Sequence, residues 1–394
     1  ENGTTKNKPY ALAKFKDELP TISNFEVTPD ENNPYYPKFT WNCKDNDTWY
    51  GFIILDKTVP KHQYHNAFCH VPMNRPIPST DNTTRLWPPN ADTDTAFDVY
   101  DYVNDINSTY GYYKNSTKTS TQTKMATDLI PASTINDEYT FLSPEGLSGW
   151  CHNFGGDDNL VVDFFGRNES NKATPQDGFS CSVIIRPSAL PNDKATICST
   201  ANAAGFRIYL DEDGYIGVMA IFNRDTAQRG VVLTSHSTVS LDGTPTNIIV
   251  TFDKYLKHGN LKLFIDGKLE DVSGRAYIDS DTGGSNVDNW EWNKEIEEGW
   301  NDLDKLYIGA GYNFGNYEGR MEELVFYDEV IYPVVPKNGE FVLETPLEES
   351  DDNGKPINYF AKLFIKDYHN IRGKTPKDVA TAPHLHLHKV GLGK

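Results

Sequence analysis

Apolar and polar residues alternate along much of the chain in short runs that end at turn-forming residues. The clearest case is the run from Leu261 to Ile265, followed by Asp266-Gly267 and a second run from Leu269 to Val272. Side chains two residues apart point to the same face of a strand, so this alternation indicates half-buried strands. Asp-Gly between two such runs is the strongest local signal for a β-hairpin. The sequence therefore predicts antiparallel β-structure here.

The same rhythm recurs from the N-terminal region to the C-terminal region, and the chain contains no apolar run of ~18 residues that would predict a membrane span. Gly, Pro, Asn and Asp separate the runs, as expected for strands joined by turns. We therefore predict an all-β fold. Further predicted strands cover residues 21–29, 37–41, 49–55, 179–187, 205–219, 247–253, 305–309, 319–327, 340–347, 359–365 and 384–390.

Composition narrows the possible classes of protein. The chain has 394 residues, enough for two or three domains, and 12% of them are aromatic. Its net charge of −19 argues against a broad nucleic-acid-binding role, because phosphate binding needs a basic face. The charge is compatible with a divalent cation or a basic partner.

Five cysteines occur in the chain, and no two of them have CxxC spacing. Most lie inside strand-like runs, so we expect buried thiols that pack as small apolar residues. A disulfide framework is the alternative. Buried thiols favour assembly in a reducing compartment. The five residues are Cys43, Cys69, Cys151, Cys181 and Cys198.

Residues 140–332 resemble the laminin G-like and concanavalin A-like jelly rolls. The segment from Trp150 to Val162 is similar to the family's opening, in which an aromatic-Gly-Asp-Asp turn leads into a strand. The strand from Phe179 to Pro187 and the hairpin from Gly205 to Met219 follow in the family's order. The strand from Gly319 to Tyr327 closes the pattern.

The flanking segments resemble two parts of a fibronectin type III-like or immunoglobulin-like sandwich. A strand ending in Trp41 and a strand beginning at Trp49 are similar to strands B and C, and Tyr359 lies where that sandwich has its corner tyrosine. The resemblance implies a concanavalin A-like jelly roll inserted into an immunoglobulin/fibronectin III-like β-sandwich. Two small terminal β elements packed separately on the jelly roll are the alternative. The predicted parts are an arm (1–20), a discontinuous sandwich (21–75 plus 338–392), a Ser/Thr-rich excursion (76–138) and the jelly roll (139–335).

Sequence motifs for catalysis are missing from the chain. Glucanases with the concanavalin-like fold carry two or three acidic residues on one strand, as retaining glycoside hydrolysis requires, and this chain has no such strand. The chain also lacks Gly-x-Ser-x-Gly, His-Glu-x-x-His and a phosphate-binding glycine loop. We therefore expect a protein that is not an enzyme, with a glycan-active enzyme as an alternative.

Two groups of residues are candidate metal ligands. Asp279 and Asp281 offer alternating oxygen ligands beside two glycines, an arrangement that suits calcium, although Asp also forms turns without any metal. His384, His386 and His388 alternate and would face one side of a strand. An exposed edge strand explains the histidines without a transition metal.

The loop at 286–300 is the candidate glycan site. A pyranose ring can stack its apolar face on an indole, and neighbouring Asp and Asn side chains can bind its hydroxyls. A protein interface is the alternative, because Trp is enriched at contact hot spots. The candidate residues are Asp288, Asn289, Trp290, Trp292 and Trp300.

Together these observations predict a surface-exposed structural or accessory protein of a phage or virus particle that binds host glycans through jelly-roll loops. Its partners would be other structural subunits or a surface glycan, and we expect a homo-oligomer or part of a larger assembly. The expected location is the virion surface or the extracellular space. A secreted or cell-surface lectin-like adhesin is the alternative function.

Overall fold

A computed structural model describes most of the predicted strands. The described residues are 21–44, 49–61, 63, 65–71, 152–156, 160–163, 178–200, 205–224, 227–253, 256, 259, 261–278, 305–311, 314–367, 380–381 and 385–387. These residues form strands and one short 3₁₀ helix, η4 (Pro336–Asn338), and none of them lies in an α-helix. The predicted all-β class is therefore confirmed. Within these ranges no helix is long and apolar enough to cross a membrane.

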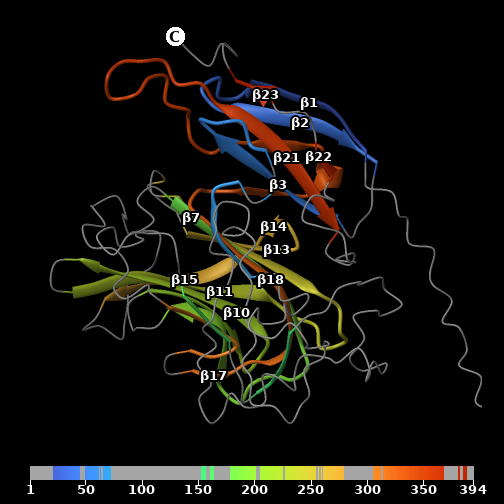
Figure 1. Ribbon diagram of the computed structural model, residues 1–394, viewed down its shortest axis with the longest axis vertical. Helices are drawn as coiled ribbons and strands as arrows, with labels where there is room; N and C mark the ends of the chain where they lie inside the picture. Colours follow the sequence, from blue (N-terminus) through green and yellow to red (C-terminus); the bar gives the residue numbers. More distant parts are fainter. Residues whose placement is uncertain are drawn as a thin grey trace, which may run out of the picture.

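Strands from both ends of the chain pair to form the small sandwich, the upper body of blue and red strands in Figure 1. One sheet has the order β1-β2-β20, and the other has the order β19-β3-β21-β22, with β23 also paired to β21. All the pairs are antiparallel. The strands are β1 (Ile22–Pro29), β2 (Pro37–Cys43), β3 (Trp49–Asp56), β19 (Tyr332–Val334), β20 (Glu340–Val342), β21 (Phe360–Asp367), β22 (Ala380–Thr381) and β23 (Leu385–His386).

The large sandwich is built mostly from the middle of the chain. Its seven-stranded sheet has the order β14-β13-β12-β7-β18-β4, with β5 also paired to β18. The strands of this sheet are β4 (Ala67–Val71), β5 (His152–Gly155), β7 (Gly178–Pro187), β12 (Thr246–Asp253), β13 (Leu261–Ile265), β14 (Lys268–Leu269) and β18 (Glu318–Tyr327).

The second sheet of the large sandwich is eight-stranded and has the order β15-β11-β10-β9-β8-β16-β6, with the short β17 pairing parallel to β8. A register shift marks a bulge in β8 opposite β9. The strands are β6 (Leu160–Asp163), β8 (Lys194–Thr200), β9 (Gly205–Asp211), β10 (Tyr215–Arg224), β11 (Ala227–Thr238), β15 (Val272–Ile278), β16 (Lys305–Ile308) and β17 (Gly315–Asn316).

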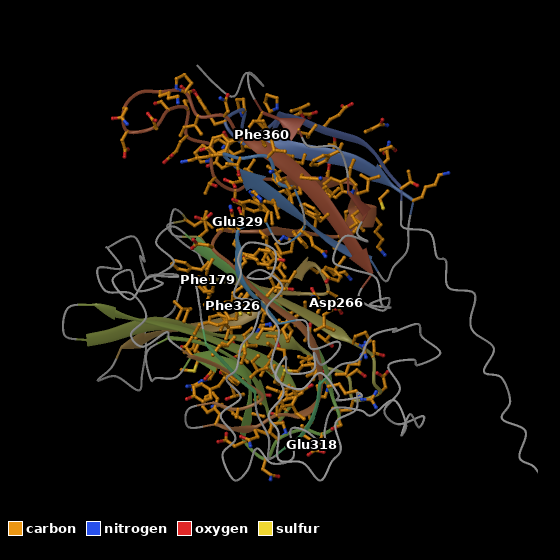
Figure 2. The ribbon with its side chains drawn as sticks, viewed as in Figure 1. Phe179, Asp266, Glu318, Phe326, Glu329 and Phe360 are labelled. Carbon is orange, nitrogen blue, oxygen red and sulfur yellow. The ribbon has the colours of Figure 1, made fainter. Side chains whose placement is uncertain are left out.

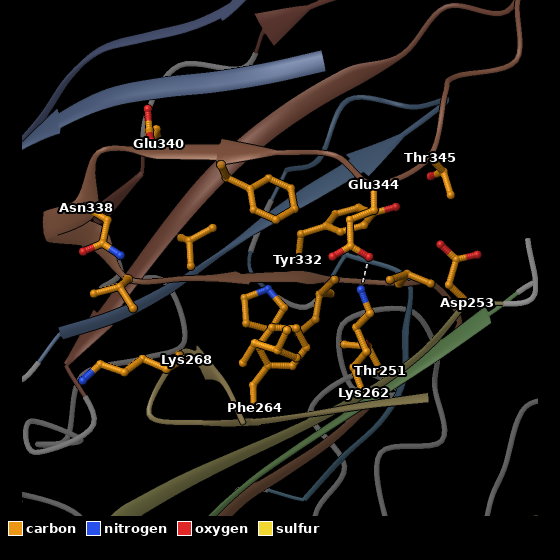
Figure 3. Close-up of a pocket in the computed structure, with 18 of the residues that line it drawn as sticks. Thr251, Asp253, Lys262, Phe264, Lys268, Tyr332, Asn338, Glu340, Glu344 and Thr345 are labelled. Atoms are coloured by element: carbon orange, nitrogen blue, oxygen red, sulfur yellow. Dashed lines mark hydrogen bonds and ion pairs between the residues drawn. The ribbon is translucent and has the colours of Figure 1, made fainter. Parts of the chain in front are cut away.

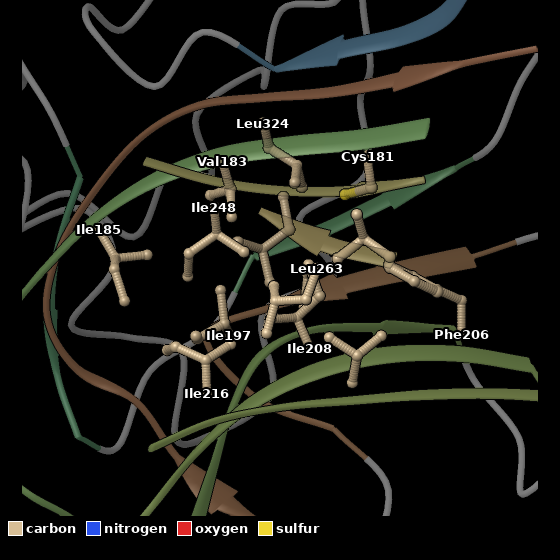
Figure 4. Close-up of a cluster of buried hydrophobic side chains, with 14 of the residues drawn as sticks. Cys181, Val183, Ile185, Ile197, Phe206, Ile208, Ile216, Ile248, Leu263 and Leu324 are labelled. Atoms are coloured by element: carbon tan, nitrogen blue, oxygen red, sulfur yellow. The ribbon is translucent and has the colours of Figure 1, made fainter. Parts of the chain in front are cut away.

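Three apolar layers hold the four sheets together. The first lies inside the large sandwich, where Val183 and Ile248 meet Phe206 and Ile208 of the opposite sheet (Figure 4). The third lies inside the small sandwich around Phe39 and its neighbours. The alternation of apolar side chains within each strand fills both layers, as expected for face-to-face sheets.

The middle layer lies between the two sandwiches, and we call it the middle core. It joins Ile184 and Ile249 of the seven-stranded sheet to Phe52 and Phe364 of the small sandwich. The rings of Phe52 and Phe364 stack with centroids 5.6 Å apart. The small sandwich is therefore packed on the large one through a buried apolar interface.

Two segments differ from the sequence-based assignment. The sequence-based division places residues 21–75 in the discontinuous sandwich. Instead, strand β4 within this range pairs with β18 in the large sandwich, where Cys69 lies opposite Phe326. Conversely, β19 precedes residue 338 but pairs with β3 in the small sandwich. Alternation alone shows that a segment is a strand and leaves its partner open, which explains both differences.

The cysteines lie largely as expected. Cys69, Cys181 and Cys198 are buried in the apolar layer of the large sandwich, whereas Cys43 is half-buried. Burial raises the pKa of the Cys181 thiol, and a hydrogen bond with Cys198 adds to this shift. Such a thiol is a poor nucleophile, because the reactive form is the thiolate. Cys151 lies outside the described residues.

Candidate functional site

A cavity of about 320 Å³ opens beside the middle core, between the seven-stranded sheet and the small sandwich (Figure 3). Strands β12, β13 and β14 form one wall, and β19, η4 and β20 form the other. Pockets of roughly 300–1,000 Å³ at interfaces between domains are common sites for small ligands. The cavity is therefore the best candidate binding site in the part of the chain that the structure describes.

The first wall ends in the hairpin that the sequence predicted. Asp266 and Gly267 have φ angles of 51° and 77°, the two positive values that a type I′ turn requires. The backbone N–H of Asp266 donates to the carbonyl of Asn247 at 2.9 Å, and the Asn247 N–H donates to Asp266 Oδ1 at 2.9 Å. These bonds tie the turn to β12.

Gly267 brings this hairpin against the opposite wall of the pocket. A Cβ atom at Gly267 would lie 2.9 Å from the carbonyl oxygen of Val334 in β19. No side chain fits at that distance without a shift of the backbone. This close approach of the two walls therefore depends on a residue without a side chain.

The second wall is held by Trp41 of the small sandwich. The indole Nε1–H of Trp41 donates to the carbonyl of Pro336 in η4 at 2.7 Å, and this bond is buried. The backbone N–H of Trp41 donates to the carbonyl of Gly339 at 2.9 Å, and Gly339 adopts the left-handed conformation with φ 70°. These contacts fix the turn from β19 into β20.

Aromatic and aliphatic side chains form the middle of the pocket. The rings of Tyr332 and Phe341 lie with centroids 5.6 Å apart, and Phe264 approaches from the opposite wall. Figure 3 shows Tyr332 on the side of β19 that faces the small sandwich and Phe264 on the other side of that strand, and the two rings pack against different apolar layers. Pro333 and Val334 complete this apolar surface.

Charged and polar groups gather at both ends of this apolar middle. At one end Lys262 of β13 forms an ion pair with Glu344 of the small sandwich, and Asp253 and Thr345 lie beside them (Figure 3). The other end holds Lys268, Asn338 and Glu340. The pocket thus offers ring faces between two sets of hydrogen-bonding groups.

The electrostatic environment favours a neutral phenol at Tyr332. Burial raises the pKa of Tyr332 well above its usual value, and the negative charges of Asp253, Glu329 and Glu344 add to the effect. The hydroxyl therefore keeps its proton and can donate a hydrogen bond to a ligand. Burial likewise raises the pKa of Asp266, against the opposing bond from the Asn247 backbone.

The candidate residues named from the sequence fall elsewhere. Asp288, Asn289, Trp290, Trp292 and Trp300 lie outside the described residues, as do Asp279 and Asp281. His384 and His388 also lie outside them, while the backbone of His386 is in β23. Among the residues that are described, no group of three or more His, Cys, Asp or Glu side chains could hold a metal ion.

The residues of the pocket were not predicted from the sequence. They come from two segments that lie far apart along the chain, 251–269 and 330–345. The motif Tyr332-Pro333 gave one usable signal. Proline within a strand-like run indicates an edge strand, because it cannot donate to a neighbouring strand. An edge strand leaves one side available for a pocket.

No family model and no curated protein matches this chain. The binding domain of botulinum neurotoxin serotype G is 13% identical, and the match covers 45% of this chain and 38% of the toxin chain with a TM-score of 0.30. The CBM40 of Ruminococcus gnavus IT-sialidase, bound to alpha2,3 sialyllactose, is 15% identical over 39% of this chain and 77% of its own, with a TM-score of 0.27.

A further partial match is domain 4 of AbnA, a GH43 extracellular arabinanase from Geobacillus stearothermophilus, in complex with arabinotriose. It is 15% identical, covers 49% of this chain and 75% of its own, and has a TM-score of 0.29. TM-scores this low carry no argument about the ligand or the activity of this chain.

Proposed function

We propose that this chain is a non-enzymatic glycan-binding protein and that the pocket between the two sandwiches holds the sugar. The observation that supports this proposal is the order of groups along the cavity. The rings of Tyr332, Phe341 and Phe264 lie between a charged end at Lys262 and Glu344 and a polar end at Asn338.

A sugar ring matches this order of groups. Its CH face is apolar and packs on an aromatic ring, while its hydroxyls project outward and both donate and accept hydrogen bonds. The carboxylates of Asp253 and Glu344 accept such bonds, and the ammonium of Lys262 and the amide of Asn338 donate them.

Leu269 offers a way to close the pocket without disturbing its walls. It lines the cavity, yet 57% of its surface is exposed, so a larger side chain has room to fold across the opening. We expect Leu269→Trp to weaken binding at least about tenfold, a loss of roughly 1.4 kcal/mol, because the sugar is excluded. A glycan array identifies the ligand, and titration calorimetry measures the change.

Leu241 provides a matched control. It is 47% exposed and lies outside the pocket lining, so Leu241→Trp adds the same side chain to the surface and should bind as the wild type does. Equal binding by Leu269→Trp and wild type would contradict the proposed site. Loss of binding in Trp292→Ala alone would favour the loop at 286–300 instead. A wild-type protein that binds no glycan on the array would remove the function itself.

We also propose that the protein is part of a phage or virus particle and lies on the virion surface or outside the cell. A homo-oligomeric state likewise stays a prediction. The buried thiols Cys69, Cys181 and Cys198 support assembly in a reducing compartment. A secreted lectin-like adhesin remains the alternative. The molecular mass of the protein isolated from its natural source distinguishes a particle component from an adhesin, because a particle component gives a symmetric multimer.

A further inference from the structure

Two short connections carry the chain between the sandwiches. Residues 57–66 lead from β3 of the small sandwich to β4 of the large one, and residues 328–331 lead back from β18 to β19. Figure 2 shows Glu329 of the second connection between the two bodies. Because Val330 and Ile331 also line the pocket, this connection is part of its wall.

A polar network joins the two connections. Asp56 Oδ2 accepts hydrogen bonds from Asn66 Nδ2 at 2.8 Å and Thr58 Oγ1 at 2.9 Å, and it lies 2.6 Å from His65 Nε2. The same Asn66 Nδ2 donates to Glu329 Oε2 at 3.2 Å. We call these five residues the crossover network.

Backbone bonds anchor the second connection to its surroundings. The N–H of Asp328 donates to the carbonyl of Asn66 at 2.9 Å. Ser180 of β7 donates its hydroxyl to the carbonyl of Glu329 at 2.9 Å and accepts the N–H of Ile331 at 2.9 Å. The segment from 328 to 331 therefore has one fixed position while the network is intact.

The two carboxyl groups of the network have opposite environments. Although burial opposes ionisation of Asp56, hydrogen bonds from His65, Thr58 and Asn66 hold its pKa well below the usual range. Glu329 Oε1 is buried, and no donor in the described part of the chain reaches it. Burial raises the pKa of Glu329 to about 9, and the negative charge of Asp56 adds to the shift.

Among the residues that the structure describes, the other groups that act on Glu329 are a carboxyl, an amide and two phenols. Asp328 is a further carboxylate, which raises the pKa of Glu329, whereas the hydrogen bond from Asn66 lowers it. Tyr327 and Tyr332 also face Glu329, and burial raises the pKa of both phenols, so both stay neutral in the physiological range. Glu329 is thus held as a neutral acid in the closed structure.

We propose that the crossover network is a proton-coupled latch on the segment 328–331, which opens this wall of the pocket more readily as the pH rises. In the closed state the buried carboxyl of Glu329 keeps its proton. Opening exposes the carboxyl to water, and the proton leaves. Ile331 is the one residue of this segment that belongs to the middle core, and the other apolar contacts of that core stay in place, so the change is local and does not separate the sandwiches.

The pH range follows from the two states of Glu329. The open segment releases the proton at an ordinary carboxyl pKa, and the closed segment releases it only near pH 9. The latch is therefore tightest below the ordinary pKa and weakens as the pH rises towards 9. Between these limits the opening equilibrium rises about tenfold per pH unit, and above them it is constant.

Native-state hydrogen exchange followed by mass spectrometry tests this proposal on the intact chain. After correction for intrinsic exchange rates, peptides that cover residues 328–334 should show an opening constant about a hundredfold larger at pH 8 than at pH 6. Glu329→Gln keeps the size and the acceptor of the side chain but cannot ionise. It should show no such increase.

Glu349→Gln is the matched control, because Glu349 is an exposed glutamate outside the network, and it should behave as the wild type does. Equal pH dependence in wild type and Glu329→Gln would overturn the proposal. An increase shared by all the strands would overturn it too, because it would report global unfolding. Should Glu329→Gln fail to fold, a flat profile in the wild type still contradicts the latch. None of these readouts depends on whether the pocket binds a sugar.

Discussion

Gly267 links local backbone geometry to the shape of the pocket. Its positive φ completes the type I′ turn, and its missing side chain lets the turn approach Val334. The type I′ turn can be recognised from the Asp-Gly pair, because few residue types tolerate the positive φ angle that this turn requires at both central positions. The approach to Val334 depends on a strand far away in the sequence, so the sequence does not reveal it.

Replacing Gly267 with alanine should destabilise the protein more than the same change at Gly243. Gly243 also has a positive φ, of 87°, but a Cβ atom there would meet nothing within 4 Å. We expect Gly243→Ala to lower the free energy of unfolding by about 1 kcal/mol through backbone strain. Gly267→Ala should lower it by about 1–2 kcal/mol more through the contact with Val334. Urea denaturation measures both, and equal losses would show that the two walls do not touch.

Strands β7 and β12 are each buried on both faces, one in the large sandwich and the other in the middle core. In β12 the side chain of Ile248 belongs to the layer inside the large sandwich, and Ile249 belongs to the middle core. In β7 Val183 and Ile184 divide in the same way. Near-continuous apolar runs such as Asn247 to Phe252 are typical of strands that are covered on both faces.

Alanine substitution in β12 tests whether the middle core stabilises the fold as strongly as the apolar layer inside the large sandwich. Ile248 and Ile249 are both fully buried, so Ile248→Ala and Ile249→Ala should each reduce the free energy of unfolding by about 2–5 kcal/mol. A loose contact between independent sandwiches predicts a much smaller loss for Ile249→Ala. Chemical denaturation of the two variants under identical conditions decides between these cases.

At the level of elements, the sequence was a good guide to strands and a poor guide to their partners. Alternation and turn residues predicted most of the strands, because both signals are local, but not β8 or the twelve-residue β11. The pairing of β4 with β18 and the pocket beside β19 arise from long-range packing. Tyr332 and Phe341 look like ordinary strand residues in the sequence, and only the packing of the two sandwiches places them in the lining of the pocket.

The whole molecule is a stack of four sheets with three apolar layers between them. Two connections and the middle core join the sandwiches, and the pocket and the crossover network lie at this junction (Figure 2). Binding and proton release would therefore act on the same wall, the segment that contains Val330 and Ile331. The proposed recognition would therefore take place at the junction, while the stacked sheets stabilise the fold.

The most direct test of this account is a crystal structure of the protein with the glycan that binds best on the array. We predict a sugar ring in the pocket between the sandwiches, with its hydroxyls bonded to Asp253 or Lys262 at one end. A glycan bound at Trp290, Trp292 and Trp300, with an empty pocket between the sandwiches, would contradict the central claim.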